Sequence, residues 1–215
     1  LQGSNTANNI FSGEIQENTG TGATAFTKSG AGTWILTRAN GYLGSSTLNG
    51  GILRLEADGA LGQGTSLSLS GTSSLHLAPT VGTITLQQNI TANGQGIGNI
   101  GLIRNLNGNN NITGIISLSG TTTFFSDADT LRYLGNPAFR SNNDATNRTF
   151  TLNGSGHHVI QNDWAHGNTA TFNKNGTGAL RLYGQRTQGG TFNLLNSAGL
   201  IVFMGNNLLN NSTLF

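Results

Sequence analysis

The sequence of 215 residues contains no cysteine, two prolines and few charged residues. The missing cysteine excludes a disulfide scaffold, thiolate zinc sites and cysteine nucleophiles. Charged residues make up 8% of the chain, against about 25% in an average domain. Lysine occurs only at Lys28 and Lys174, and glutamate only at Glu14, Glu17 and Glu56. Because exposed helix faces would lack their usual residues, a helical bundle is excluded.

The charge balance limits the possible partners. Ten Lys and Arg residues stand against eight Asp and Glu residues, for a formal net charge of +2. The cations form no patch that could neutralise a row of phosphates, so we expect no nucleic-acid partner. The chain also has no apolar run close to the roughly 18 residues of a membrane helix, so we expect no membrane span in this chain.

Small and neutral polar residues are abundant instead. Gly, Asn, Thr and Ser together account for 107 residues, half of the chain. The apolar share of 35% is large enough to drive folding. Short runs of alternating apolar and polar residues, bounded by Gly and Asn, are typical of strands. They predict strands at 33–36, 52–55, 66–69, 74–77, 83–86, 115–118, 149–152, 179–182 and 200–203. No segment predicts a significant helix.

An internal repeat selects among the all-β architectures. The run FTKSGAGTWIL at 26–36 returns as FNKNGTGALRL at 172–182, an offset of 146 residues. Further matches follow in the same order, with 51–55 returning at 199–203. The pattern predicts one and a half repeats, with repeat cores at 26–62 and 172–209 and intervening rungs over 63–171. We interpret 1–215 as a single continuous β-solenoid.

A solenoid explains this repetition because it adds rungs along an axis, whereas a sandwich or barrel closes on itself. Gly, Asn and Thr suit such rungs, since like residues stack at strand spacing and Asn side chains hydrogen-bond along the stack. The prediction is an all-β, right-handed parallel β-helix with no significant helix. At an assumed ~20 residues per rung, it has about ten rungs.

The run FTKSGAGTWILTRAN at 26–40, followed by Tyr42, Gly44, Thr47 and GILRL at 51–55, carries a family resemblance. It resembles the autotransporter-associated β-strand repeat, the passenger-associated repeat of bacterial surface proteins. The resemblance implies an exported β-helical stalk, located outside the cell or on the bacterial surface.

The acidic residues are candidates for catalytic or metal sites, because parallel β-helices also carry glycoside-cleaving enzymes that need two close carboxyl groups. Glu56 with Asp58, and Asp127 with Asp129, lie two positions apart. We interpret both pairs as solvated turns, with a calcium or catalytic pair as the alternative.

Histidine forms one local cluster. His157, His158, Asp163 and His166 could converge at a rung corner, where imidazole and carboxylate serve metal or acid–base chemistry. We favour a structural cluster, with a metal or acid–base site as the alternative.

Glycine pairs and aromatic residues also have two interpretations. The Gly-x-Gly elements, such as 30–32 and 176–178, are interpreted as turns between rungs rather than phosphate loops, since no helix follows them. Trp34, Tyr42, Tyr133 and Trp164 are interpreted as core residues, with sugar stacking as the alternative.

The expected function is therefore structural. The hypothesis is a non-enzymatic extracellular bacterial protein, either a stalk or adhesin segment or a self-assembling filament subunit of a surface or biofilm matrix. It has no catalytic, cofactor-binding or metal-binding residue and needs no cofactor. The alternative is a carbohydrate-active or polysaccharide-binding β-helix protein.

The expected partner is a second copy of the chain, with a host surface or polysaccharide as a further possibility. Charged residues and prolines at strand edges prevent pairing with other chains, but this sequence has few charges and only Pro79 and Pro137. Copies could therefore join end to end. They could also exchange a terminal strand such as 1–11.

Overall fold

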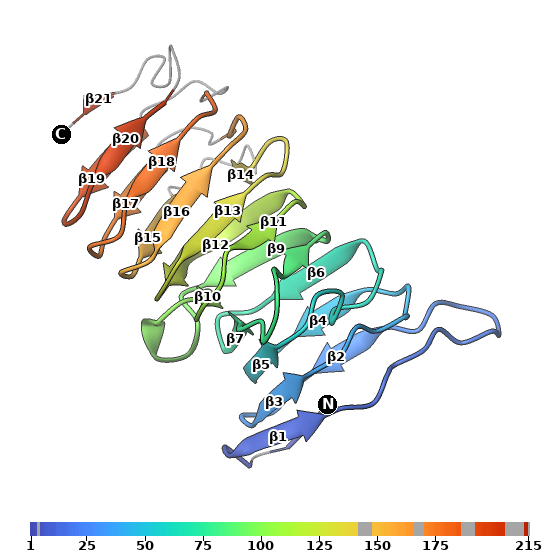
Figure 1. Cartoon of the computed structure of the whole chain (residues 1–215). Coiled ribbons are helices and arrows are strands. Elements are labelled where there is room, and N and C mark those ends of the chain that lie inside the picture. Colours follow the sequence, from blue (N-terminus) through green and yellow to red (C-terminus); the bar gives the residue numbers. More distant parts are fainter. Residues whose placement is uncertain (4, 142–147, 166–169, 186–191, 205–212, 215) are drawn as a thin grey trace.

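The structure of the chain is a computed structural model that describes all residues except 4, 142–147, 166–169, 186–191, 205–212 and 215. Its strands stack into a parallel β-solenoid of about eight turns with essentially no helix. Figure 1 shows the coils rising from β1 to β20, with the chain ends at opposite ends of the stack. The predicted all-β solenoid is confirmed, with about eight turns in place of the expected ten.

The strands form three columns, each running along the solenoid. The β3 column contains β1 (Asn8–Phe11), β3 (Thr33–Leu36), β5 (Gly51–Leu55), β7 (Ser73–Leu77), β10 (Ile103–Asn105), the second half of β12 (Ile116–Ser126), β15 (Arg148–Asn153), β17 (Ala170–Lys174), β19 (Phe192–Asn196) and β21 (Thr213–Leu214). The β2 column contains β2 (Phe26–Lys28), β4 (Ser46–Leu48), β6 (Ser66–Leu69), β9 (Asn89–Gly94), the first half of β12, and β14 (Phe139–Ser141). The β11 column contains β8 (Thr85–Leu86), β11 (Asn110–Ile112), β13 (Thr130–Tyr133), β16 (His157–Ile160), β18 (Leu180–Leu182) and β20 (Ile201–Phe203).

The nine strand positions predicted from alternation are all confirmed as strands. The run at 83–86 is shortened to Thr85–Leu86 (β8). The amide of Ile84 donates 2.7 Å to the side-chain oxygen of Asn110 instead of to a strand neighbour. A buried side chain from the next coil therefore ends this strand.

The core changes character along the solenoid. In the lower coils leucines stack in register, as Leu53 does on Leu75 and Leu55 on Leu77. The upper coils contain aromatic rings, with centroids of Phe139 and Phe150 separated by 4.5 Å. Alternation along each strand sends these apolar residues inward and leaves the polar residues between them outside.

The two copies of the repeat occupy different columns. The first copy begins on β2 in the β2 column, where Lys28 pairs with Leu48. The second begins on β17 in the β3 column, where Lys174 pairs with Leu152 and Asn196. Between them, β12 is 11 residues long and pairs with strands of both columns. Part of the second predicted core, 172–209, lies outside the described residues.

Candidate functional site

The most distinctive polar feature is a buried lysine at a corner of the solenoid. Lys28 ends β2 and has no exposed surface. Its Nζ donates hydrogen bonds to the carbonyl oxygens of Ser29 (3.2 Å), Gly30 (2.8 Å) and Gly50 (2.8 Å). Because Gly50 belongs to the next coil, the ammonium joins two coils. Burial lowers the pKa of Lys28.

The second copy of the repeat builds the same corner. Lys174 ends β17, is fully buried, and donates to the carbonyl oxygens of Asn175 (3.0 Å), Gly176 (2.8 Å) and Ala198 (3.2 Å). Burial also lowers the pKa of this lysine. The two lysines therefore have the same role, although they lie in different columns.

The corner geometry explains the glycines of the motif. Gly30 and Gly176 both have φ of 76°, a left-handed conformation that favours glycine. A Cβ on Gly51 would lie 2.5 Å from the Lys28 Nζ. The interpretation of these Gly-x-Gly elements as turns between rungs agrees with their position.

Other corners use different polar side chains for the same purpose. Asn105 ends β10, is buried, and donates 2.9 Å to the carbonyl of Ala128 in the next coil. His158 is buried and lies between the Tyr133 hydroxyl (2.8 Å from Nδ1) and the Asn153 carbonyl (2.9 Å from Nε2). This pairing assigns the proton to Nε2, since a carbonyl oxygen only accepts.

The acidic pairs singled out from the sequence act as structural acceptors and ion-pair partners. Glu56 pairs with Arg54 at 2.8 Å, and the Asp58 carboxylate accepts the Thr85 amide at 2.8 Å. In the other pair, Asp127 binds Arg104 at 2.7 Å, and Asp129 accepts the Gly108 amide at 2.7 Å. Each of these four carboxylates therefore has a partner: Glu56 has one two residues away on its own coil, and the other three have one on a neighbouring coil.

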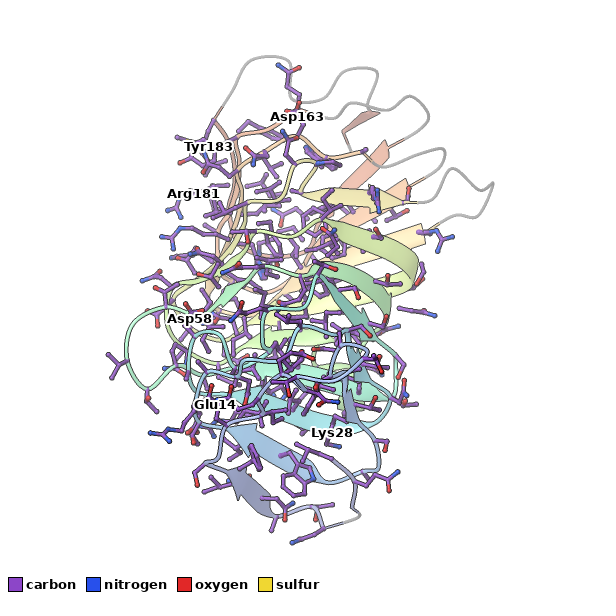
Figure 2. All side chains as sticks on the ribbon, turned by 90° about the vertical axis from the view of Figure 1, so that its right-hand side faces the viewer. Glu14, Lys28, Asp58, Asp163, Arg181 and Tyr183 are labelled. Atoms are coloured by element: carbon purple, nitrogen blue, oxygen red, sulfur yellow. The ribbon has the colours of Figure 1, made fainter. Side chains whose placement is uncertain are left out.

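Two further carboxylates hold loops. Glu17 accepts the backbone amides of Thr24 (2.7 Å) and Leu43 (2.5 Å), and the bond from Thr24 is the largest cause that lowers its pKa. Asp163 accepts the amide of Gln185 at 2.8 Å. Figure 2 shows Glu14, Asp58, Arg181 and Tyr183 toward one side of the solenoid and Lys28 toward the other.

The histidine cluster does not form a site within the described residues. His157 accepts the Ala179 amide at its Nδ1 (3.0 Å), while His158 is enclosed in the core. His166 lies outside the described residues. Across the part of the chain that is described, no group of three or more His, Asp or Glu side chains could hold a metal ion.

The aromatic residues considered for sugar stacking lie mostly inside. Tyr42 and Tyr133 have no exposed surface and Trp164 is 1% exposed, while Trp34 is half-buried. The Tyr42 hydroxyl lies 2.8 Å from that of Ser46, and burial raises the pKa of Tyr42 to about 12. An exposed aromatic platform is thus not built from these four residues.

The fold and its corners define the class of this protein. It is a repeat-built parallel β-solenoid whose corners are closed by buried polar side chains. Residues 26–55 match the family described as passenger-associated-transport-repeat. The chain thus carries such a repeat, and its β-solenoid fits an autotransporter-associated repeat protein. No curated protein and no solved structure matches the chain.

This repeat implies an exported, surface-related protein and suggests a structural segment of an autotransporter passenger. None of the helical structure in the described ranges has the length and apolarity needed to cross a bilayer.

The role of the lysines is what sequence reasoning missed. The chain has only two lysines, and they lie 146 residues apart at equivalent places in the repeat. That coincidence was the available signal for a structural role. The stacking contact with Gly50 could not be inferred, because it depends on which turn lies above β2.

Proposed function

We propose that this protein is a non-enzymatic structural segment of an exported bacterial surface protein, serving as a β-solenoid stalk or adhesin segment. The observation that carries this proposal is the paired lysine corner. In both repeats the lysine ammonium of the motif donates its hydrogen bonds to carbonyl oxygens of its own turn and of the next coil. A motif used this way stabilises the stack of coils.

The placement of the carboxylates supports the absence of catalysis. A glycoside-cleaving site needs two carboxyl groups facing each other across a cleft with one free to take up a proton. Glu56 and Asp127 are held by arginines, and Asp58 and Asp129 accept backbone amides. These contacts favour a supporting role for the two pairs.

The test is an activity assay against a panel of neutral and acidic polysaccharides, measured as new reducing ends or unsaturated products. We expect none above background, for the wild type and for Asp127→Asn/Asp129→Asn alike. Depolymerisation by the wild type that the double variant loses would overturn the proposal. A rod of roughly 40 Å for about eight coils, measured by small-angle scattering, would support the stalk geometry.

A second candidate function is self-assembly into a filament. At the upper end of the described coils, Leu200 is 60% exposed, Met204 50% and Phe203 40%. Among the described residues β20 pairs with β18 alone, and an edge strand of this kind can pair with a further strand. An apolar face beside an open edge favours stacking of another coil.

Electron microscopy of the purified chain tests this candidate. We expect filaments in the wild type and their loss in Leu200→Lys/Phe203→Lys. The matched control is Val81→Lys, because Val81 is 88% exposed and lies in the loop before β8, away from this end. A strictly monomeric wild type at high concentration would reject the filament candidate and leave the stalk proposal intact.

A further inference from the structure

The outer side of the β2 column presents an unbroken row of hydroxyl groups. Thr27, Thr47, Ser68, Thr91 and Ser117 follow one another in register on five successive coils. Strand pairing spaces them at about 4.8 Å. Their side chains point outward because the residues on either side of each, such as Ile90 and Ala92, are buried.

This row is flanked by more neutral polar groups. We call the whole surface the neutral face; besides the row, it comprises Ser45, Asn49, Ser66, Ser70, Asn89, Asn93 and Ser119. Among the described residues, the hydroxyls of Thr27, Ser68 and Thr91 have no hydrogen-bond partner. From β2 to the first half of β12, no outward residue of these strands carries a charge; the next residue in the row is Arg140 on β14, whose Nε donates to the Ser117 Oγ at 2.8 Å.

Composition alone does not produce this neutral stretch, since the other columns carry charges at outward places on neighbouring coils, whereas the first outward charge of the β2 column is Arg140 on β14. In the β3 column Arg54, His76 and Arg104 stack in register. In the β11 column Arg132 and Arg181 lie in the row of Val159. The neutral face is thus a distinct surface of the solenoid.

A groove lies at the beginning of this face. It has a volume of about 490 Å³ and is lined by Asn40, Gln63, Gln87 and Gln88, together with glycines and Ala39. This volume is within the range of small-ligand sites. Gln87 and Gln63 are exposed, and Gln88 is anchored by donating to the carbonyls of Leu61 and Gly62 (both 3.2 Å).

The groove is lined by residues that come just before the strands of the neutral face. Gln88 directly precedes β9 and its outward Asn89, while Gln63 lies three residues before Ser66 at the start of β6. Neutral amides and hydroxyls both donate and accept hydrogen bonds, as sugar hydroxyls do. Within the row on these five coils no side chain is charged, and Arg140 lies beyond Ser117 at the upper end of the row.

The dimensions exclude a stable protein interface on this face. Five coils spaced at about 4.8 Å, with strands about 10 Å long, give the face an area of a few hundred Å². A stable protein complex buries ~800 Å² on each partner, which is more than this face offers. Each hydrogen bond to a sugar hydroxyl replaces one to water and is individually weak. The occupant must therefore make several such bonds at once, as a polymer does.

We propose that the neutral face and its groove bind a linear, neutral polysaccharide, whose chain runs along the solenoid axis with about one sugar per coil. An extended polysaccharide advances by nearly one coil height per sugar, so one contact can recur on each of the five coils. The groove holds one sugar against Gln63 and Gln87. This inference is independent of catalysis and of filament formation.

The test is binding of the monomeric full chain to insoluble and gel-embedded polysaccharides, namely cellulose, chitin and xylan as neutral ligands and alginate as an acidic one. We expect binding to at least one neutral polymer and no dependence on salt, since no ion pair is involved. Gln63→Ala/Gln87→Ala and, separately, Ser68→Lys/Thr91→Glu should each weaken binding about tenfold.

Matched controls lie away from the neutral face. Gln161→Ala, and Thr177→Lys/Gln161→Glu, alter exposed residues of the upper coils with the same chemistry and should bind as the wild type does. Unchanged thermal unfolding verifies that all variants fold. The proposal is overturned if no neutral polymer binds, if only alginate binds, or if the controls weaken binding as much as the face variants. The polysaccharide cleavage assay is separate, so failure here leaves the structural role standing.

Discussion

At the scale of single residues, the solenoid closes its corners with buried polar side chains. Where a strand ends, the turn carbonyls lose their ladder partners and need another donor. Lys28 and Lys174 each supply three hydrogen bonds from one ammonium, and Asn105 supplies an amide. Neither ammonium has a carboxylate partner among the described residues, so the carbonyl dipoles stabilise these buried charges.

Replacing Lys28 tests this role. Lys28→Met keeps the length of the side chain but leaves the carbonyls of Ser29, Gly30 and Gly50 without their donor. We expect a loss of about 2–4 kcal/mol in the free energy of unfolding, measured by urea denaturation. Arg38→Met is the control, because Arg38 is exposed and its loss should change stability by less than about 0.5 kcal/mol. Equal stability of Lys28→Met and the wild type would refute the role.

Histidine burial predicts a pH dependence of stability. Burial is the largest cause that lowers the pKa of His158 to about 4, and the nearby Lys174 and His157 act in the same direction. In the unfolded chain the pKa is about 6.5. Between these values the unfolded state binds the extra proton, so this stability is fully present above pH ~6.5 and is lost as the pH falls toward 4.

The expected loss is about 3 kcal/mol for His158, with a similar contribution from His76, whose pKa burial also lowers to about 4. Urea unfolding at a series of pH values measures the slope. His158→Phe should be less stable at neutral pH and show a flatter dependence. An unchanged slope in that variant would show that His158 does not carry the effect.

At the scale of elements, turns rather than strands set how closely coils approach. A Cβ on Gly64 would overlap the carbonyl oxygen of Gly44 in the coil below, and one on Gly178 would overlap that of Gly156. The strands keep their spacing through ladder hydrogen bonds. The turns between strands can keep the same spacing between coils only where glycines let the two backbones come into direct contact.

Gly64→Ala should therefore destabilise the protein by about 2–3 kcal/mol, seen as a lower midpoint in thermal unfolding. The control is Gly20→Ala, since its nearest contact would be the Asn18 side chain at 3.4 Å. That variant should be neutral or slightly more stable. If Gly64→Ala is as stable as the control, the turn backbone around residue 64 can shift to accept a Cβ at little cost in free energy.

At the scale of the whole molecule, the solenoid behaves as a one-dimensional stack. Each coil pairs only with its neighbours, so its stability is the sum of local terms and contacts to the coils on either side. β1 pairs only with β3, whereas β5 has partners on both sides. The ends should open more readily than the middle.

Hydrogen exchange monitored by mass spectrometry measures this gradient. We expect peptides covering β1 and β20 to exchange faster than those covering β5, β7 and β15, after correction for intrinsic rates. Uniform protection along the chain would instead indicate that the solenoid opens in a single cooperative step.

The repeat copies illustrate how far sequence reasoning reaches. The matching runs at 26–36 and 172–182 correctly indicate the inward positions, the glycine turn and the two flanking strands. They do not indicate that β2 and β17 belong to different columns. Which column each strand joins depends on the lengths of the coils between β2 and β17. These lengths vary from 19 residues (Thr33 to Ile52) to 28 (Leu75 to Ile103).

The candidate sites show the same division. The sequence predicts turns at the acidic pairs but not the partners Arg104, Thr85 and Gly108, because these three contacts bring together different coils. The neutral face was also invisible in the sequence. Its members Thr47, Ser68 and Thr91 lie more than 20 residues apart and meet only through strand register.

The sequence by itself determined that the chain is all β, where its strands alternate, and that a repeat of about 145 residues stacks as a solenoid. These properties follow from local alternation and turn chemistry, which act within a few residues. Tertiary structure decided the columns, the lysine links between coils, and the separation of a neutral face from charged ones. Each of these depends on which residue lies directly above another in the next coil. The number of residues in every coil along the stack determines that alignment.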